Sequence, residues 1–235
     1  MSNTLFGRKP LLENLTSGNI VNVDLSKNNR DLISTLKKYS IQYQLRDDSF
    51  FNKYDKKLNH QGIIITLKES TRVNDLQSLL TLVKTKIKSL ILVVDSIQDP
   101  QNFGSILRTC DAMGVDAVIY KKDNQVQVND FVSKSSMGAI QYLNLIKVTN
   151  ISNALNELKH NGYWVYTSAL LDQAVNYDKV KYENKCVLVV GNEENGVSSI
   201  VINHSDFLIK IPMHGKIQSL NVAVATGILL SKINS

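Results

Sequence analysis

Three short polar segments lie far apart in the chain but carry residue types that can act together. They are 99–108 (Asp-Pro-Gln-Asn-Phe-Gly-Ser-Ile-Leu-Arg), 191–196 (Gly-Asn-Glu-Glu-Asn-Gly) and 211–221, which begins Ile-Pro-Met and ends Ser-Leu-Asn. Each follows an apolar, strand-like run and precedes the expected start of a helix. In an open α/β sheet such loops gather at the carboxyl ends of the strands, where ligands bind. An arginine, a carboxylate and small polar side chains brought together there indicate an active site.

The first segment combines an expected helix start with a cation. Asn102 is a candidate cap for a helix from about 102 to 113, and Gly104 lets a ligand or another backbone approach closely. Arg108 lies in an otherwise apolar stretch, where an unpaired charge is costly to bury. The arginine either forms a structural salt bridge within the protein or binds the phosphate or ribose oxygens of a ligand.

The other two segments supply a carboxylate, caps and an apolar wall. The loop 191–196 offers backbone N–H groups and Glu193, and it matches neither a P-loop nor a dinucleotide-binding glycine fingerprint. An exposed acidic turn is the alternative. Ser219 is a candidate N-cap with Asn221 in the first turn of the following helix. The run 211–213 provides an apolar wall suited to an adenine ring.

The elements that position these segments alternate between strands and helices. Leu90–Val94 and Cys186–Val190 are unbroken apolar runs, typical of strands buried on both faces. The final helix, Ser219–Ile233, is apolar on nearly every face, so other protein must cover it, and this predicts a homodimer. Further strands are expected at 117–120, 142–146, 163–168 and 207–211, and further helices near 128–136 and 151–159.

The first third of the chain has its own pattern and charge. Residues 1–70 alternate between short helices and strands, as in a small α/β layer domain. Residues 71–88 form an expected linker whose helical part packs on one domain or the other, and 89–235 form the second domain. The net charge is +6, and its surplus lies wholly before residue 90. This is typical of a nucleic-acid-binding module joined to a near-neutral partner, with lysine-rich solubility as the alternative.

Several classes are disfavoured by composition. No apolar run approaches the roughly 18 residues of a membrane span, and the first residues lack the apolar centre of a signal peptide. The four histidines show no metal-ligand spacing. Cys110 and Cys186 are expected to be packing residues rather than a disulfide or metal pair. A cytoplasmic protein without a metal is therefore expected.

Taken in order, the three segments resemble motifs 1, 2 and 3 of the SpoU/TrmH family. The members of this family are S-adenosylmethionine-dependent RNA ribose 2′-O-methyltransferases. The segment 135–139 (Ser-Ser-Met-Gly-Ala) matches a landmark of that family between motifs 1 and 2. Residues 5–15 resemble the start of the ribosomal-protein-L30e-like substrate-binding domain of the bacterial 23S rRNA guanosine-2′-O-methyltransferase subgroup. The resemblance spans almost the whole chain.

The resemblance implies an α/β fold whose C-terminal parallel-sheet domain contains a deep trefoil knot, preceded by a small L30e-like domain, in an obligate dimer. It implies that Arg108 is the group that faces RNA, supported by Asn102, Glu193, Ser219 and Asn221. It also implies a cofactor pocket lined by Val190, Gly191, Asn192, Gly196, Ile211, Met213, Ser219 and Leu220. Glu194 departs from the family, since many members have glycine there, and a glutamate would be strained if that position requires a positive φ.

The implied reaction is in-line attack of a ribose 2′-hydroxyl on the sulfonium methyl group. Proposals for the family make the motif 1 arginine the base, but a guanidinium has a pKa of about 12.5–13.8. Electrostatic stabilisation of the forming alkoxide is therefore the favoured role for Arg108, with the proton passing to a phosphate oxygen or water. The expected substrate is a guanosine of 23S rRNA. The alternatives are a tRNA ribose and a non-catalytic RNA-binding protein.

Overall fold

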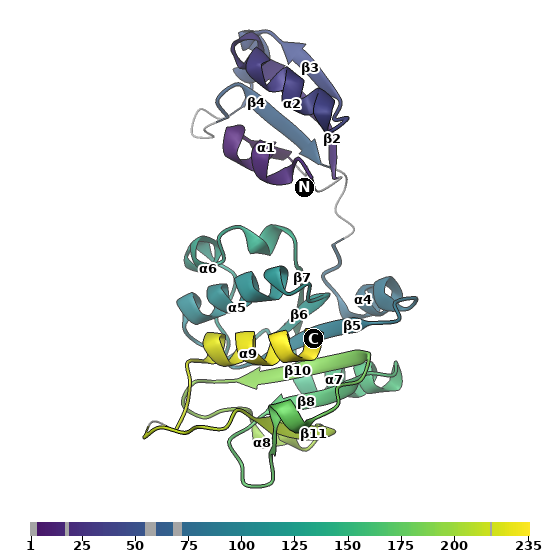
Figure 1. The fold of residues 1–235 in the computed structure, drawn as a ribbon, viewed down its shortest axis with the longest axis vertical. Coiled ribbons are helices and arrows are strands. Elements are labelled where there is room, and N and C mark those ends of the chain that lie inside the picture. The colour runs from purple at the N-terminus through teal and green to yellow at the C-terminus, as the bar shows by residue number, and fades with distance from the viewer. Residues whose placement is uncertain (1–3, 17–18, 55–59, 68–71, 217) are drawn as a thin grey trace. The chain divides into compact units, whose positions relative to one another are not determined.

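The computed structural model describes residues 4–16, 19–54, 60–67, 72–216 and 218–235 (Figure 1). The chain divides into two compact units, Met1–Thr71 and Arg72–Ser235. The expected domain boundary at residue 70 falls at 68–71, outside the described residues. No helix among the described residues is long and apolar enough to cross a membrane.

The first unit is a four-stranded sheet with helices packed on it (Figure 1). Its strand order is β1-β4-β2-β3, with β2 and β3 parallel and β4 antiparallel to both β1 and β2. Leu11, Leu25, Leu36 and Ile63 lie in its core. The elements are β1 Thr4–Phe6, α1 Arg8–Asn14, β2 Ile20–Ser26, η1 Lys27–Leu32, α2 Ile33–Lys38, β3 Tyr43–Arg46, α3 Asp48–Phe51 and β4 Ile63–Leu67.

The second unit is built on a parallel sheet of seven strands in the order β7-β6-β5-β10-β8-β11-β9. Its central strands β5 and β10 are buried at every residue except Lys185, as their unbroken apolar runs predict. The strands are β5 Ser89–Asp95, β6 Ala117–Lys121, β7 Asn144–Val148, β8 Trp164–Ser168, β9 Val175–Asn176, β10 Lys185–Gly191 and β11 Phe207–Lys210.

Helices cover both faces of this sheet. One face packs against α5, α6 and α9, and the other against α4, α7 and α8. The helical part of the expected linker is α4, which buries Leu79, Leu80 and Val83 on the second unit. Cys110 and Cys186 are buried and unpaired. The helices are α4 Leu76–Val83, α5 Pro100–Ala112, α6 Asp130–Ser135, η2 Ala139–Gln141, α7 Ile151–His160, η3 Tyr177–Lys179, α8 Ser199–Ile202 and α9 Val222–Asn234.

Two helix starts differ from the prediction. Helix α5 is capped by Asp99, whose carboxylate accepts hydrogen bonds from the backbone N–H groups of Gln101 (3.0 Å) and Asn102 (3.3 Å). A proline at the first helical position, with φ already suited to a helix, favours this earlier start. Helix α9 is capped by Asn221, not Ser219, which lies two residues before the cap. Both changes free a polar side chain for other contacts.

Candidate functional site

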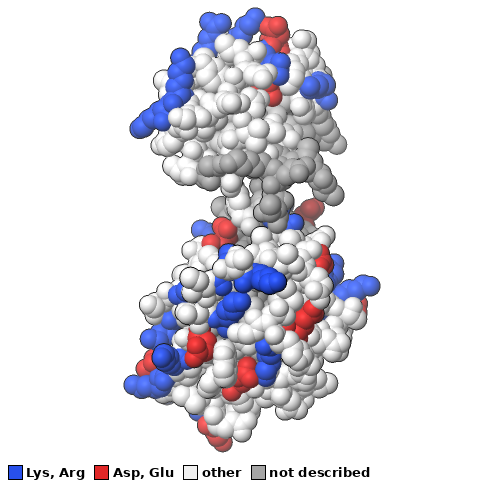
Figure 2. Space-filling model, turned by 90° about the vertical axis from the view of Figure 1, so that its right-hand side faces the viewer, with Lys and Arg blue, Asp and Glu red and all other residues white. Residues whose placement is uncertain are grey.

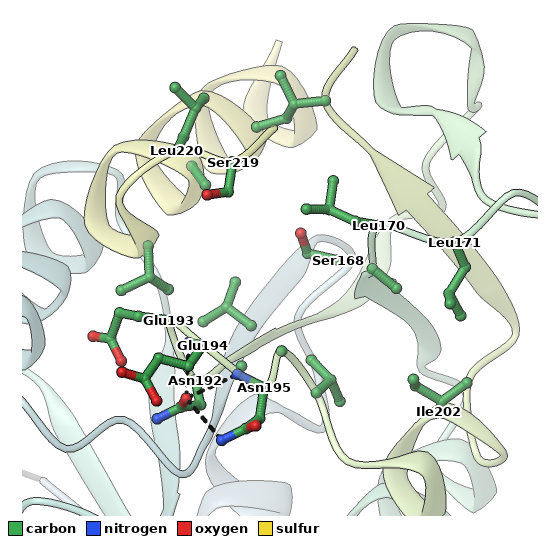
Figure 3. Close-up of a pocket in the computed structure, with 18 of the residues that line it drawn as sticks. Ser168, Leu170, Leu171, Asn192, Glu193, Glu194, Asn195, Ile202, Ser219 and Leu220 are labelled. Carbon is green, nitrogen blue, oxygen red and sulfur yellow. Dashed lines mark hydrogen bonds between the residues drawn. The ribbon is translucent and has the colours of Figure 1, made fainter. Parts of the chain in front are cut away.

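A cavity of about 420 Å³ lies at the carboxyl ends of the parallel strands (Figure 3). Three loops form its walls: 168–171 after β8, 190–197 at the end of β10, and residues of 211–225 that follow β11. Strand β10 lies between β5 and β8 although many residues separate it from both in sequence. The cavity therefore opens where the strand order departs from chain order, as is typical of ligand sites in open α/β sheets.

The structure brings together all the residues expected around the cofactor. In Figure 3, Glu193 and Glu194 lie on one side of the cavity, Leu170 and Leu171 on the other, and Ser219 and Leu220 above. The members of the expected set that line the cavity are Val190, Gly191, Asn192, Gly196, Ile211, Met213, Ser219 and Leu220.

One wall of the cavity was missed from the sequence. The loop 168–171, Ser-Ala-Leu-Leu, follows β8 but contains none of the glycines or prolines that marked the other segments. Leu170 is 62% exposed and Leu171 is 39% exposed, so this loop presents two adjacent apolar side chains to the cavity. Two leucines that lie just beyond the end of a predicted strand were the available signal.

A chain of hydrogen bonds joins the three predicted segments. The Nδ2 group of Asn102 donates to Oε1 of Glu193 (2.7 Å), and its Oδ1 accepts from Nδ2 of Asn221 (2.9 Å). The Oδ1 atom of Asn221 accepts from the first turn of α9, which leaves its Nδ2 group to donate. Because one amide both donates and accepts, Asn102 fixes the orientation of the Glu193 carboxylate relative to α9.

The loop 191–196 is a tight turn held by Asn192. The backbones of Asn192 and Gly196 exchange two hydrogen bonds of 2.9 Å, and Gly196 has a φ of +65°. The Oδ1 atom of Asn192 also accepts from the backbone N–H groups of Glu194 (2.9 Å) and Asn195 (3.0 Å). The strain considered for Glu194 does not arise, because Glu194 is not among the residues with positive φ. The positive φ that favours glycine occurs at Gly196 instead.

Arg108 stands apart from this cluster. Its side chain is exposed and lines no part of the cavity, and none of the described residues pairs with it. The structural salt bridge considered for it is therefore absent from the described part of the chain. Phe103, Ile106 and Leu107 face the core, so the apolar stretch around Arg108 belongs to the opposite side of α5. Ser219 lines the cavity but takes no part in the Glu193–Asn102–Asn221 hydrogen-bond chain.

The close approach that Gly104 permits is made by the chain itself. A side chain at 104 would meet Oγ of Ser135 at 1.8 Å and the backbone nitrogen of Ser136 at 3.0 Å. Ser135 also donates to the carbonyl of Pro100 (3.2 Å). The segment 135–139 therefore packs directly on the start of α5 and holds it against α6.

The cavity has an acidic and apolar character. Its lining contains Glu193 and Glu194 but no lysine or arginine among the described residues, and Ile211, Met213 and Leu220 form apolar surface. Such a lining suits a ligand with a flat apolar group and a positive charge. The volume lies within the roughly 300–1,000 Å³ of small-molecule sites.

Comparisons with known proteins agree with this geometry. Residues 89–231 match the SpoU rRNA Methylase family, and residues 4–73 match the family described as RNA 2′-O ribose methyltransferase substrate binding. An uncharacterized tRNA/rRNA methyltransferase of Mycoplasma genitalium is 40% identical over 229 residues, covering 96% of this chain and 94% of its own. An uncharacterized tRNA/rRNA methyltransferase of Borreliella burgdorferi is 42% identical, covering 77% and 83%.

Solved structures show the same fold. The TrmH/SpoU tRNA modifying enzyme of A. aeolicus superposes with a TM-score of 0.58 at 36% identity, covering 68% of this chain and 80% of its own. The AdoMet-bound rRNA methyltransferase of Sinorhizobium meliloti superposes with a TM-score of 0.65 at 22% identity, covering 99% and 86%.

The fold and cavity thus define an α/β domain with a parallel-sheet core of the SpoU methylase type, preceded by a small N-terminal domain. The chain belongs to the SpoU methylase family and is an RNA methyltransferase that depends on S-adenosylmethionine. The cavity residues fit that cofactor, because its adenine is flat and its sulfonium is positive.

Proposed function

We propose that this protein methylates the 2′-hydroxyl of a ribose in RNA, and that the target is a guanosine of 23S rRNA. The observation that carries the proposal is the Glu193–Asn102–Asn221 hydrogen-bond chain beside the cavity. When bound, S-adenosylmethionine supplies a methyl group activated by its sulfonium centre. The chain's own task is then to hold the ribose and to stabilise the charge that develops on its oxygen.

The cavity residues divide into two roles in this proposal. The eight cavity residues expected from the sequence would hold the cofactor. Asn102, Glu193, Ser219 and Asn221 would orient the ribose, and the Arg108 guanidinium would stabilise the forming alkoxide. Arg108 is assigned this electrostatic role and not that of a proton acceptor. A phosphate oxygen of the RNA or water would receive the proton.

Residues 1–70 would bind the RNA substrate, 71–88 would link the domains and 89–235 would catalyse transfer. Figure 2 shows Lys and Arg outnumbering Asp and Glu on the visible face of the first unit. Among the described residues of that unit, eight Lys and Arg face five Asp and Glu, and four ion pairs account for most of the acids. The basic residues without an acidic partner include Arg30, Lys37 and Lys38, on η1 and α2.

These three exposed cations favour η1 and α2 as the surface that contacts RNA phosphates. Lys38 also lies 5.8 Å from the ring centre of Tyr39, which is 39% exposed and able to stack on an unpaired base. Leu32 and Leu36 anchor the opposite side of the same segment in the core. The cations therefore project from a rigid element, which suits recognition of a structured RNA.

A homodimer is part of the proposal. Helix α9 buries Leu229, Leu230 and Ile233, yet Val224 on the same helix is 53% exposed. Arg108 lies six residues beyond Asn102 on α5, about 9 Å along the helix, and outside the cavity of its own chain. We propose that a second copy covers Val224 and brings groups of its own to Arg108.

Mapping of 2′-O-methyl groups tests the substrate. Ribosomal and transfer RNA from cells with and without the gene would be compared, and loss of one guanosine mark in 23S rRNA is expected. Loss of a tRNA mark with intact rRNA would favour the second candidate, which the tRNA modifying relative supports. Loss of neither mark, in a protein that binds RNA but not S-adenosylmethionine, would favour the non-catalytic alternative.

The RNA surface can be tested by neutralising the triple set Arg30, Lys37 and Lys38 to glutamine. Affinity for bacterial 23S rRNA should fall, and the slope of log K against log salt should decrease by about 2, because each phosphate contact contributes roughly 0.7–0.9. A matched variant neutralises Arg8, Lys9 and Lys27, which already have acidic partners. Equal slopes for the two triple variants would contradict the assignment.

A further inference from the structure

A buried carboxylate lies directly beneath the cavity wall. Asp95 ends strand β5 and is 1% exposed. Its Oδ2 atom accepts hydrogen bonds from the backbone nitrogen (3.0 Å) and the hydroxyl (2.7 Å) of Ser198. Its Oδ1 atom accepts from Oγ of Ser96 (3.0 Å) and pairs with Nζ of Lys121, on β6, at 2.7 Å. Both oxygens are therefore used, and each contacts a different part of the fold.

The next residue holds the other end of the same loop. The carbonyl of Ser96 accepts a hydrogen bond from Nδ2 of Asn192 (3.0 Å). Ser96 has a φ of +66°, in the left-handed region that strains a residue other than glycine. Lys121 also contacts Oγ of Ser96 at 3.3 Å. The strained backbone thus directs a carbonyl to Asn192, and the surrounding contacts maintain it.

The cavity wall 192–197 is consequently fastened at both ends to two consecutive residues. Asn192 is bound to Ser96 at its start, and Ser198 is bound to Asp95 directly after its end. Between these points lie Glu193 and the tight turn closed by Gly196. A buried ion pair gains little net stability over apolar packing. The pair is explained better by the placement of this loop than by stability.

We propose that Asp95 is a positioning residue that sets the affinity for S-adenosylmethionine by fixing the loop 192–197 against the end of β5. The inference rests on the proposed role of that loop as a cofactor wall. Asp95 does not line the cavity, so it acts through Ser198 and through Ser96 to Asn192. Burial alone would raise the pKa of Asp95, but hydrogen bonds from Lys121 and Ser198 outweigh it and hold the pKa below its usual value.

The same sheet provides a matched control. Asp116 precedes β6 and also accepts from a lysine, a serine hydroxyl and a backbone nitrogen, those of Lys86, Ser89 (2.6 Å) and Leu90 (3.1 Å). Its side chain is 10% exposed. These partners surround the amino ends of the strands, and none of them lines the cavity. Asp116→Asn therefore disturbs a similar cluster away from the loop.

The test is calorimetric titration of S-adenosylmethionine into the full-length protein and its variants, without RNA. Asp95→Asn replaces an acceptor oxygen with a donor, and Ser198→Ala removes one hydrogen bond to the carboxylate. Each should raise Kd about 10-fold or more, since hydrogen bonds to charged groups are the strong ones. Stoichiometry should stay near one site per chain. Ser198→Thr, which keeps the hydroxyl, should restore Kd to near the wild-type value.

The readouts separate positioning from stability. A purely structural role would lower the bound stoichiometry and the melting temperature while leaving the Kd of the folded fraction unchanged, and this result would overturn the inference. It would also be overturned if Asp116→Asn raised Kd as much as Asp95→Asn at equal loss of stability. Failure of the 23S rRNA proposal would leave these binding constants unaffected, because no RNA is present in the titration.

Discussion

Each edge of the seven-stranded sheet has an aspartate that accepts hydrogen bonds from a serine and a lysine, but the two clusters hold different parts of the fold. At the amino edge, Asp116 joins the starts of strands through Ser89, whose hydroxyl also contacts the hydroxyl of Tyr163 (2.6 Å). At the carboxyl edge, Asp95 joins a strand end to the loop that walls the cavity. Ligands of open α/β sheets bind at the carboxyl edge, so a buried carboxylate at that edge is placed to act on a ligand site. Position in the sheet, rather than residue type, therefore decides what such a cluster does.

The largest expected effect is that of Arg108. This residue lies on α5 and lines no part of the cavity, so its role does not depend on either aspartate cluster. Arg108→Ala should lower the rate of methyl transfer about 100- to 1,000-fold, the usual cost of removing a group that stabilises an oxyanion. The measurement is single-turnover transfer to 23S rRNA, with S-adenosylmethionine and RNA affinities determined separately. Arg108→Lys should recover little, because a lysine lacks the planar fork of donors. Near wild-type transfer by Arg108→Lys would exclude a special role for guanidinium geometry.

A pair of glycine substitutions compares the two edges directly. Gly191→Ala places a Cβ 2.3 Å from the carbonyl of Gly196, so the cavity loop must shift. Affinity for S-adenosylmethionine should fall about 10- to 100-fold, the equivalent of the 1–3 kcal/mol that overpacking costs. Gly162 lies before β8, at the amino edge, with a φ of +85° and open space around it.

Gly162→Ala should therefore cost only about 1–2 kcal/mol of stability through backbone strain. Its Kd for the cofactor should match that of the wild type. Thermal unfolding and cofactor titration measure the two effects. If Gly162→Ala weakened cofactor binding as much as Gly191→Ala, the placement of the cofactor site at the carboxyl edge of the sheet would be contradicted.

The smallest expected effect is a loss of stability in acid. Because the folded pKa of Asp95 is lowered, its contribution to stability is present above the unfolded value of about 3.9 and is lost as pH falls through the folded pKa. The free energy of unfolding of the wild type should exceed that of Asp95→Asn at pH 7, and the difference should shrink below about pH 4. Urea unfolding across this range measures it. A constant difference down to pH 2 would show that the ionised form of Asp95 is not what stabilises the fold.

The sequence predicted the parts of the molecule that depend on local pattern. The apolar runs at 90–94 and 186–190 are the buried parallel strands β5 and β10, and the three polar segments do meet at one edge. Helix starts were less certain, because each segment offered two residues able to cap. Asp99 caps α5 although Asn102 was expected, and Asn221 caps α9 although Ser219 was expected.

The sequence by itself predicted an α/β fold from its periodicity and turn chemistry, and the family from the order of its motifs. The eight cavity residues were predicted only through the resemblance to that family. The tertiary structure decided which polar groups pair, because pairing depends on the strand order, which periodicity does not encode. Placing β10 between β5 and β8 brings Ser198 to Asp95 and Glu193 to Asn102, and it adds the wall 168–171. Such contacts join residues about a hundred positions apart, and a hydrogen bond needs both partners within about 3 Å.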